Sequence, residues 1–277
     1  TLASATTVRP TVTEVELLDL DFTAAATLDL RNSSDITSVE LEYSAAPTIN
    51  NASAALASIT IDEASANTDN LAVDYAASSD SAVTITVAGS DTNADNDVAV
   101  SVGDITVTDN AGALTVSSEG EADNSIDAFT ADDVTTITVA ATSMGLTQTG
   151  AFSAAAATAA TFNATADDLS VGVGSAVALT DAESVTLAAV GGSLTSTLIT
   201  TAANSTVTVT AAGSDDNDVS ASLDADHFST ITLTATGGAD ITLSAITFEG
   251  ENAAADDIDT SIVASVEADS VITISDL

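Results

Sequence analysis

Apolar and polar residues alternate along most of the chain. Clear examples are Val83–Val87, Val98–Val102, Thr136–Val139 and Val207–Thr210. Successive side chains of a β-strand point to opposite faces, so this two-residue period predicts strands with one buried face. Thr fills many of the polar positions, and its β-branched side chain favours extended backbone. Asp, Asn, Gly and Ser cluster between the runs, as is typical of turns. The pattern therefore predicts an all-β protein.

A short motif, an acidic turn followed by a Ser/Thr-rich strand, recurs along the chain. Its copies place Thr138, Thr186, Thr232 and Thr273 at matching positions, 48, 46 and 41 residues apart. Another strand falls roughly midway in each interval. A repeat of about 20–24 residues is the length expected for one rung of a coiled β-solenoid.

The aromatic content separates two all-β architectures. Phe, Trp and Tyr make up 3% of the chain, and there is no Trp. Sandwich domains usually centre on large aromatic side chains between two sheets. A narrow solenoid stacks small and β-branched residues instead, and this chain is rich in them. We therefore predict a parallel β-solenoid, with tandem β-sandwich domains as the alternative.

A longer repeat indicates an internal duplication. Val83–Asp91 matches Val207–Asp215, and Asp95–Val98 matches Asp216–Val219 after a short insertion. The matches keep their order and predict a duplicated unit of roughly 125 residues. Residues 1–145 would then form the first β unit with an N-terminal extension, and residues 146–277 the second.

The charge of the chain excludes several classes of partner. There are 42 acidic and 2 basic residues, giving a net charge of −40, and Arg9 and Arg31 are the only fixed cations. Nucleic acids and anionic membrane surfaces require clustered Lys and Arg, so neither is expected as a partner. The chain has no run of 18 apolar residues, so insertion into a membrane is not expected. A compact chain of this charge repels itself and is expected to need salt or bound cations.

Residues suited to catalysis are scarce. The chain has no Cys, and its one His, His227, follows an acidic turn. A solenoid enzyme that cuts acidic polysaccharides would need cations to hold its substrate and aromatic platforms for the sugars. We therefore expect no enzyme activity and assign no catalytic residue.

Calcium binding is the chemistry that the sequence favours. Ca²⁺ takes six to eight oxygen ligands, several of them carboxylates on a turn. Asp residues gather in turn-like clusters that recur in the two predicted units, and the alternative is that they are solvated turns with local hydrogen bonds. The candidate ligands are Asp91, Asp95, Asp97, Glu119, Glu121, Asp123, Asp127, Asp215, Asp216, Asp218, Glu249, Glu251, Asp256, Asp257 and Asp259.

The Ala/Thr/Val/Asp-rich strands and the turn-and-strand Asp224–Leu233 resemble those of bacterial surface-layer proteins and of repeats-in-toxin-type secreted proteins. Gly237–Leu243 is the nearest match to the glycine-rich nonapeptide of the latter. The resemblance implies a calcium-dependent lattice or fibre protein outside the cell.

These observations predict a structural protein at the cell surface. The expected function is a self-assembling surface-layer or matrix-filament subunit, stabilised by calcium and polymerising with its own copies. Cell-surface polysaccharide is a candidate anchor. The segment Thr1–Thr13 has few turn signals and is expected to add to a neighbouring copy. The alternative function is a stalk segment of a large secreted calcium-binding adhesin that binds another cell, a host or ice.

Overall fold

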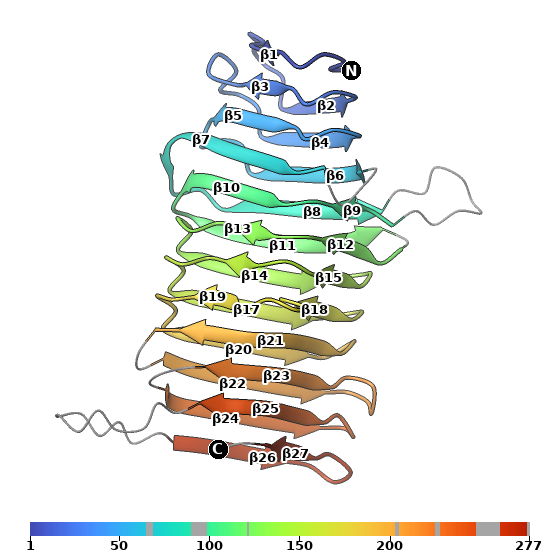
Figure 1. Ribbon diagram of the computed structural model, residues 1–277, viewed down its shortest axis with the longest axis vertical. Coiled ribbons are helices and arrows are strands. Elements are labelled where there is room, and N and C mark those ends of the chain that lie inside the picture. The colour runs from blue at the N-terminus through green and yellow to red at the C-terminus, as the bar shows by residue number, and fades with distance from the viewer. Residues whose placement is uncertain are drawn as a thin grey trace, which may run out of the picture.

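The protein is a parallel β-solenoid, seen in a computed structural model (Figure 1). The structure describes residues 1–64, 69–89, 99–120, 122–202, 205–224, 228–247 and 261–275. The chain winds alternately through two sheets that face each other across the core, and every strand pairing is parallel. The predicted parallel β-solenoid is confirmed.

The first sheet has 11 strands, one on each rung. They are β2 (Leu17–Phe22), β4 (Ser38–Tyr43), β6 (Ser58–Ala64), β8 (Val83–Gly89), β11 (Ala113–Gly120), β14 (Thr136–Ala141), β17 (Ala159–Ala164), β20 (Ser184–Ala189), β22 (Ser205–Ala212), β24 (Phe228–Thr236) and β26 (Ser261–Val266).

The second sheet has 16 strands, because several rungs cross it as two short strands with a bend between them. They are β1 (Thr7–Val8), β3 (Thr27–Asp29), β5 (Thr48–Ala52), β7 (Leu71–Ser79), β9 (Ser101–Val102), β10 (Ile105–Asn110), β12 (Asn124–Ile126), β13 (Phe129–Thr130), β15 (Leu146–Gln148), β16 (Phe152–Ser153), β18 (Leu169–Val171), β19 (Val177–Leu179), β21 (Leu194–Thr201), β23 (Val219–Asp224), β25 (Ile241–Thr247) and β27 (Ile272–Ile274).

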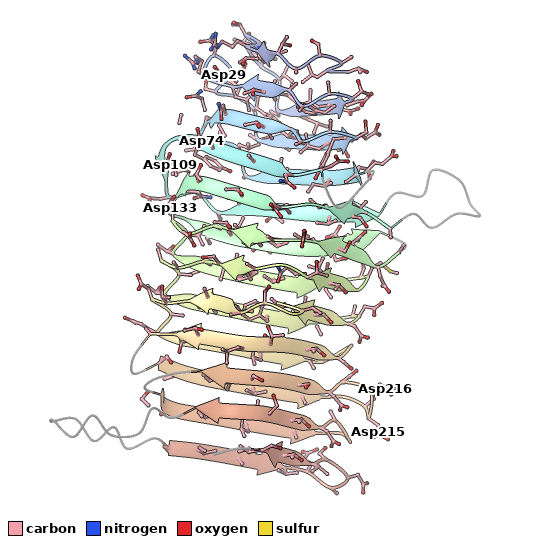
Figure 2. The ribbon with its side chains drawn as sticks, viewed as in Figure 1. Asp29, Asp74, Asp109, Asp133, Asp215 and Asp216 are labelled. Carbon is pink, nitrogen blue, oxygen red and sulfur yellow. The ribbon has the colours of Figure 1, made fainter. Side chains whose placement is uncertain are left out.

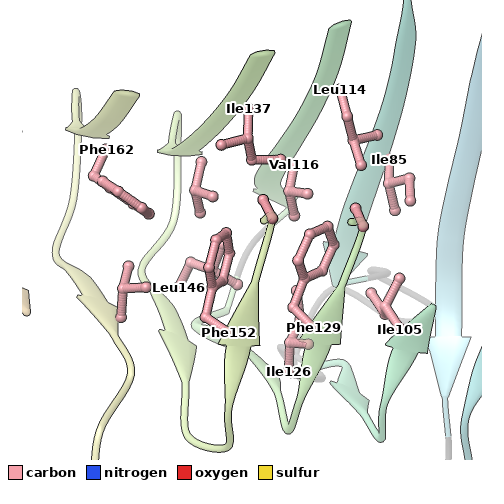
Figure 3. Close-up of a cluster of buried hydrophobic side chains, with 14 of the residues drawn as sticks. Ile85, Ile105, Leu114, Val116, Ile126, Phe129, Ile137, Leu146, Phe152 and Phe162 are labelled. Atoms are coloured by element: carbon pink, nitrogen blue, oxygen red, sulfur yellow. The ribbon is translucent and has the colours of Figure 1, made fainter. Parts of the chain in front are cut away.

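The core lies between the two sheets. Inward side chains at the same register position of successive strands stack into rows that run along the solenoid. In the 11-stranded sheet, Val139 pairs with Phe162 and Phe162 with Leu187, and all three are buried. The ring of Phe152 stacks on that of Phe129, with centroids 5.0 Å apart, and meets Phe162 edge-on at 5.6 Å (Figure 3). These rings join the two sheets near the middle of the solenoid.

The rung length agrees with the sequence repeat in the middle of the chain. Val139 and Phe162 are paired 23 residues apart, and Thr138 and Thr186 lie two rungs apart in one column. Thr273 was predicted at the matching position after Thr232, and this is wrong. Thr273 lies in the 16-stranded sheet beside Thr242, while Val263 pairs with Thr232. Leu233 of β24 pairs with Ala264 of β26, 31 residues later, so this rung is longer than the 23-residue rung from β14 to β17. The extra length displaces the sequence motif by half a rung.

Neither sheet breaks at the predicted unit boundary. Across residue 145, β12 pairs with β15 and β14 with β17. One core cluster extends from Phe22 to Leu243. The repeat strands β8 and β22 both lie in the 11-stranded sheet, as do strands on all the rungs between them. The duplication of residues 1–145 and 146–277 therefore stays a prediction.

Candidate functional site: acidic corners of the solenoid

One corner of the solenoid is formed by the residues that directly precede the strands of the 16-stranded sheet; we call it the Asp corner. The pairing of β12, β15, β18, β21, β23, β25 and β27 stacks these residues one above the other. The stacked residues are Asp123, Gly145, Asp168, Ser193, Asp218, Asp240 and Val271.

The aspartates of this corner bind the backbone of the next rung. In each case the Oδ1 atom accepts a hydrogen bond from the backbone N–H of the residue stacked on it. The bonds are Asp123 to Gly145 (3.0 Å), Asp168 to Ser193 (2.7 Å), Asp218 to Asp240 (2.8 Å) and Asp240 to Val271 (2.7 Å). A charged acceptor makes a shorter and stronger bond than a neutral one. Each aspartate thus satisfies a backbone donor at the point where the chain turns into a strand.

Asp215 and Asp216 lie outside this row, in the turn after β22. Both are exposed, and Figure 2 shows them at this end of the rungs. The Asp215 carboxylate lies against Gly238, where an added Cβ would clash with Oδ1. Residue 238 also has a φ of 94°, so both the lack of space and the backbone conformation favour glycine there. Asp218 points its Oδ1 to the next rung instead, so these three predicted ligands do not converge on one point.

The other described candidates are also separated. Asp127 lies between β12 and β13, and its Oδ1 accepts a hydrogen bond from Thr149 Oγ1 at 3.2 Å. Glu119 is exposed near the end of β11. Among the described residues, no three His, Asp or Glu side chains form a group that could hold a metal ion. The candidates Asp91, Asp95, Asp97, Glu121, Glu249, Glu251, Asp256, Asp257 and Asp259 lie outside the described residues.

The opposite side of the rungs carries a second set of aspartates, which the sequence analysis did not single out. Asp74, Asp109 and Asp133 follow one another along this side (Figure 2). The N–H of Asp109, a residue with a φ of 58°, donates to Asp133 Oδ2 at 3.0 Å. Thr108 Oγ1 donates to Asp74 Oδ1 at 3.0 Å. These carboxylates also serve as acceptors between rungs.

Both arginines of the chain bind one buried carboxylate near the N-terminal end. Arg9 Nε and an Arg31 Nη atom each lie 2.7 Å from Asp29 Oδ2, and Asn51 Nδ2 donates to Oδ1 at 2.9 Å. Asp29 is 2% exposed. Hydrogen bonds from Arg31 and then Arg9 hold the pKa of Asp29 well below its usual range. This cluster was not predicted, although Arg9 and Asp29 are 20 residues apart, the same separation as the paired residues of β1 and β3.

Acidic side chains also form a row on the outer face of the first rungs. Asp21, Glu42 and Glu63 pair across β2, β4 and β6. Glu42 is exposed, but desolvation by the surrounding atoms, and then the neighbouring charges of Glu63 and Asp62, raise its pKa. Like charges opposite each other destabilise a sheet. This row is therefore a place where protons or cations would stabilise the fold.

No protein-family model, no curated protein and no solved structure matches this chain. Within the described ranges, no helix is long and apolar enough to cross a membrane. The described acidic side chains are arranged to accept backbone hydrogen bonds at the corners and to charge the surface. The hydrogen bonds of the Asp corner connect neighbouring rungs of the solenoid.

Proposed function

We propose that the chain is an extracellular structural protein, a subunit that assembles with its own copies into a surface layer or filament and is stabilised by calcium. The observation that carries the proposal is the exposure of β26, which pairs with β24 on one edge. All six residues of β26 are exposed. The neighbouring strand β24, with which β26 pairs, has buried inward residues. Ile262 and Val266 occupy inward columns and are 38% and 48% exposed.

The N-terminal end offers a matching surface. Thr1–Thr13 contributes β1, which pairs with β3 on one side, and Leu2, which bridges to Phe22. The outer edge of β2 carries the inward residues Leu18 and Leu20, which are only partly buried. An open strand edge pairs readily with another chain. Stacking β26 of one copy on β2 of the next would continue the parallel sheet and cover the apolar residues of both ends.

Charge favours this contact over a side-by-side one. The strand β26 has no charged residue, whereas the outer face of β2 has Asp19 and Asp21. The contact would thus place uncharged side chains opposite these acids. At the acidic corners and the outer face of the first rungs, the surfaces of two copies carry like charge and repel each other. Calcium can bridge carboxylates of two surfaces because it accepts six to eight oxygen ligands. Since the described residues form no preformed metal group, the calcium proposal rests on this charge balance.

Light scattering and electron microscopy would test assembly in chelator, in millimolar calcium and in molar NaCl. We expect polymers with calcium and single solenoids in chelator at ordinary salt. Ile262→Glu, which places a charge on β26, should reduce polymer formation. The matched control is Thr147→Glu, on the outer face of β15. Particles of unchanged size on adding calcium would contradict assembly, and a lasting monomer would favour the adhesin stalk. If NaCl replaces calcium fully, the requirement is for screening and not for calcium.

A further inference from the structure

Threonines form an unbroken column on the outer face of the 11-stranded sheet. The strand registers align one Thr from each of seven consecutive rungs, β8 to β24 (Figure 1). We call this column the Thr ladder; its members are Thr84, Thr115, Thr138, Thr161, Thr186, Thr208 and Thr232. Adjacent strands lie about 4.8 Å apart, so the ladder is a straight row about 29 Å long.

The hydroxyl groups of the Thr ladder take no part in holding the fold together. None of them has a hydrogen-bond partner among the described residues. Threonines at the corners behave differently. Thr135, Thr142 and Thr158 each donate from Oγ1 to a backbone carbonyl of the preceding rung, at 3.3, 2.8 and 3.2 Å. The corner threonines thus have a structural role, while the ladder presents its hydroxyls to solvent.

The two columns beside the Thr ladder are uncharged as well. One contains Thr86, Ser117, Ala140, Asn163, Ala188, Thr210 and Thr234, and the other contains Ala113, Thr136, Ala159, Ser184, Thr206 and Thr230. In a chain of net charge −40, these three columns carry only hydroxyls, Ala side chains and the amide of Asn163. Glu119 of β11 lies on the same face, outside the three columns. Asn163 Oδ1 is a buried acceptor on this face with no partner among the described residues.

The spacing of the face is regular in both directions. Strands β8, β11, β14, β17, β20 and β22 pair without a bulge, and the pairing of β22 with β24 has one register shift, before Thr206 and outside the Thr ladder. Register shifts interrupt the 16-stranded sheet at four pairings. Hydroxyls therefore repeat every 4.8 Å or so along the ladder. On every strand of the ladder except β17, a second hydroxyl lies about 6.6 Å away along the strand, whereas Ala159 and Asn163 flank Thr161. A partner that binds such a face must present hydrogen-bonding atoms that repeat with nearly the same two spacings. The oxygen atoms on a prism face of ice do so.

We infer that the outer face of the 11-stranded sheet, from β8 to β24, is an ice-binding surface. Rows of hydroxyls can join the hydrogen-bonded lattice, and the methyl groups between them order the water that they contact. Other repeating solids fit less well. A crystalline polysaccharide calls for exposed aromatic platforms. The Phe and Tyr side chains that the structure describes are buried, namely Phe22, Tyr43, Tyr75, Phe129, Phe152 and Phe162. A mineral of divalent cations calls for carboxylates, which these columns lack.

Ice affinity of the whole chain tests this inference. Ice is grown slowly from a solution of the protein in chelator, so that calcium-driven assembly does not contribute, and the protein in the ice is compared with that in the liquid. We expect the wild type to enter the ice. Thr138→Tyr with Thr186→Tyr should lose most of this enrichment, because two bulky side chains lift the ice from the ladder. The matched control is Thr147→Tyr with Thr195→Tyr, which sits on the outer face of the 16-stranded sheet and should behave as wild type.

Circular dichroism and melting would confirm that the variants fold, and Thr161→Tyr alone is the fallback if the double ladder variant does not. Exclusion of the wild type from ice would overturn the inference, as would equal loss in ladder and control variants. If the wild type is excluded from ice and dimerises in a way that only the ladder variant abolishes, the face binds a second copy and not ice. These outcomes are separate from the calcium-induced polymerisation measured above.

Discussion

Removing the carboxylate of Asp218 should loosen the connection between two rungs. Its Oδ1 accepts the backbone N–H of Asp240 at 2.8 Å, at the start of β25. A hydrogen bond to a charged group contributes about 1.5–3 kcal/mol, and leaving its donor unpaired adds to the loss. Two effects reduce this value: Asp218 is partly exposed, and its charge lies one rung from that of Asp240. We expect Asp218→Ala to cost about 1–2 kcal/mol locally.

Amide hydrogen exchange at Asp240 is the direct measurement. In a solenoid, each rung contacts only its neighbours, so local opening can differ from global unfolding. A loss of about 1–2 kcal/mol corresponds to exchange that is roughly fivefold to thirtyfold faster. Asp218→Asn keeps an acceptor oxygen without the charge and should give a smaller increase. Asp216→Ala, an exposed acid of the same turn, is the matched control and should leave the exchange rate unchanged.

The comparison also separates hydrogen bonding from metal binding at this turn. If Asp216→Ala and Asp218→Ala accelerate exchange equally, and only when calcium is present, the turn acts as a calcium ligand set and the assigned hydrogen bond is unimportant. If the Asp218→Ala effect is the same in chelator and in calcium, the carboxylate acts on the backbone, as its geometry indicates. An unchanged rate in Asp218→Ala under both conditions would refute the role of the Asp corner.

Three further changes test other parts of the structure. Phe152→Ala should cost about 3–5 kcal/mol in urea unfolding by removing the ring between Phe129 and Phe162, with Phe152→Leu costing less; equal costs would contradict the role of the stack. The folded pKa of Glu42 is raised, so ionised Glu42 destabilises the fold and stability falls as pH rises through that pKa. Glu42→Gln should therefore raise the melting temperature at pH 7 and leave it unchanged well below pH 4.5. Glu183→Gln, at another exposed acid, is the control. Asp29→Asn should lower the melting temperature at pH 7. Because the folded pKa of Asp29 is depressed, the difference in melting temperature from wild type should shrink only as pH falls below 3.8. A difference that does not change with pH would show that charge is not the cause.

The sequence was sufficient for the architecture because alternation and rung length both act locally. The run Thr136–Val139 shows which residues face inward, and its spacing from later runs gives the rung. The paucity of aromatics correctly favoured a narrow solenoid over a sandwich. The position of Thr273 was wrong because a long connection before β26 shifts the motif from one sheet to the other.

The candidate site was harder to predict because spatial neighbours in a solenoid are about one rung apart in sequence. Asp215, Asp216 and Asp218 are adjacent in the chain, yet the partner of Asp218 is Asp240. Likewise, Asp29 forms ion pairs with Arg31, two residues later, and with Arg9, 20 residues earlier. Grouping acids by sequence proximity therefore suggested metal clusters, whereas comparing positions one rung apart would have indicated a row of aspartates that bind the backbone.

The pairing of β8 with β11 shows that register does not depend on the length of the connection. Ile85 pairs with Val116, 31 residues later, in the same way that Val139 pairs with Phe162 after 23. The entropy of closing a loop grows only slowly with its length, so the extra residues cost little. The same holds between β24 and β26, where Leu233 pairs with Ala264. The protein is thus a natural rod-shaped display scaffold: peptides inserted at either connection would project from a fixed point along the rod, while the rungs on both sides keep their alignment.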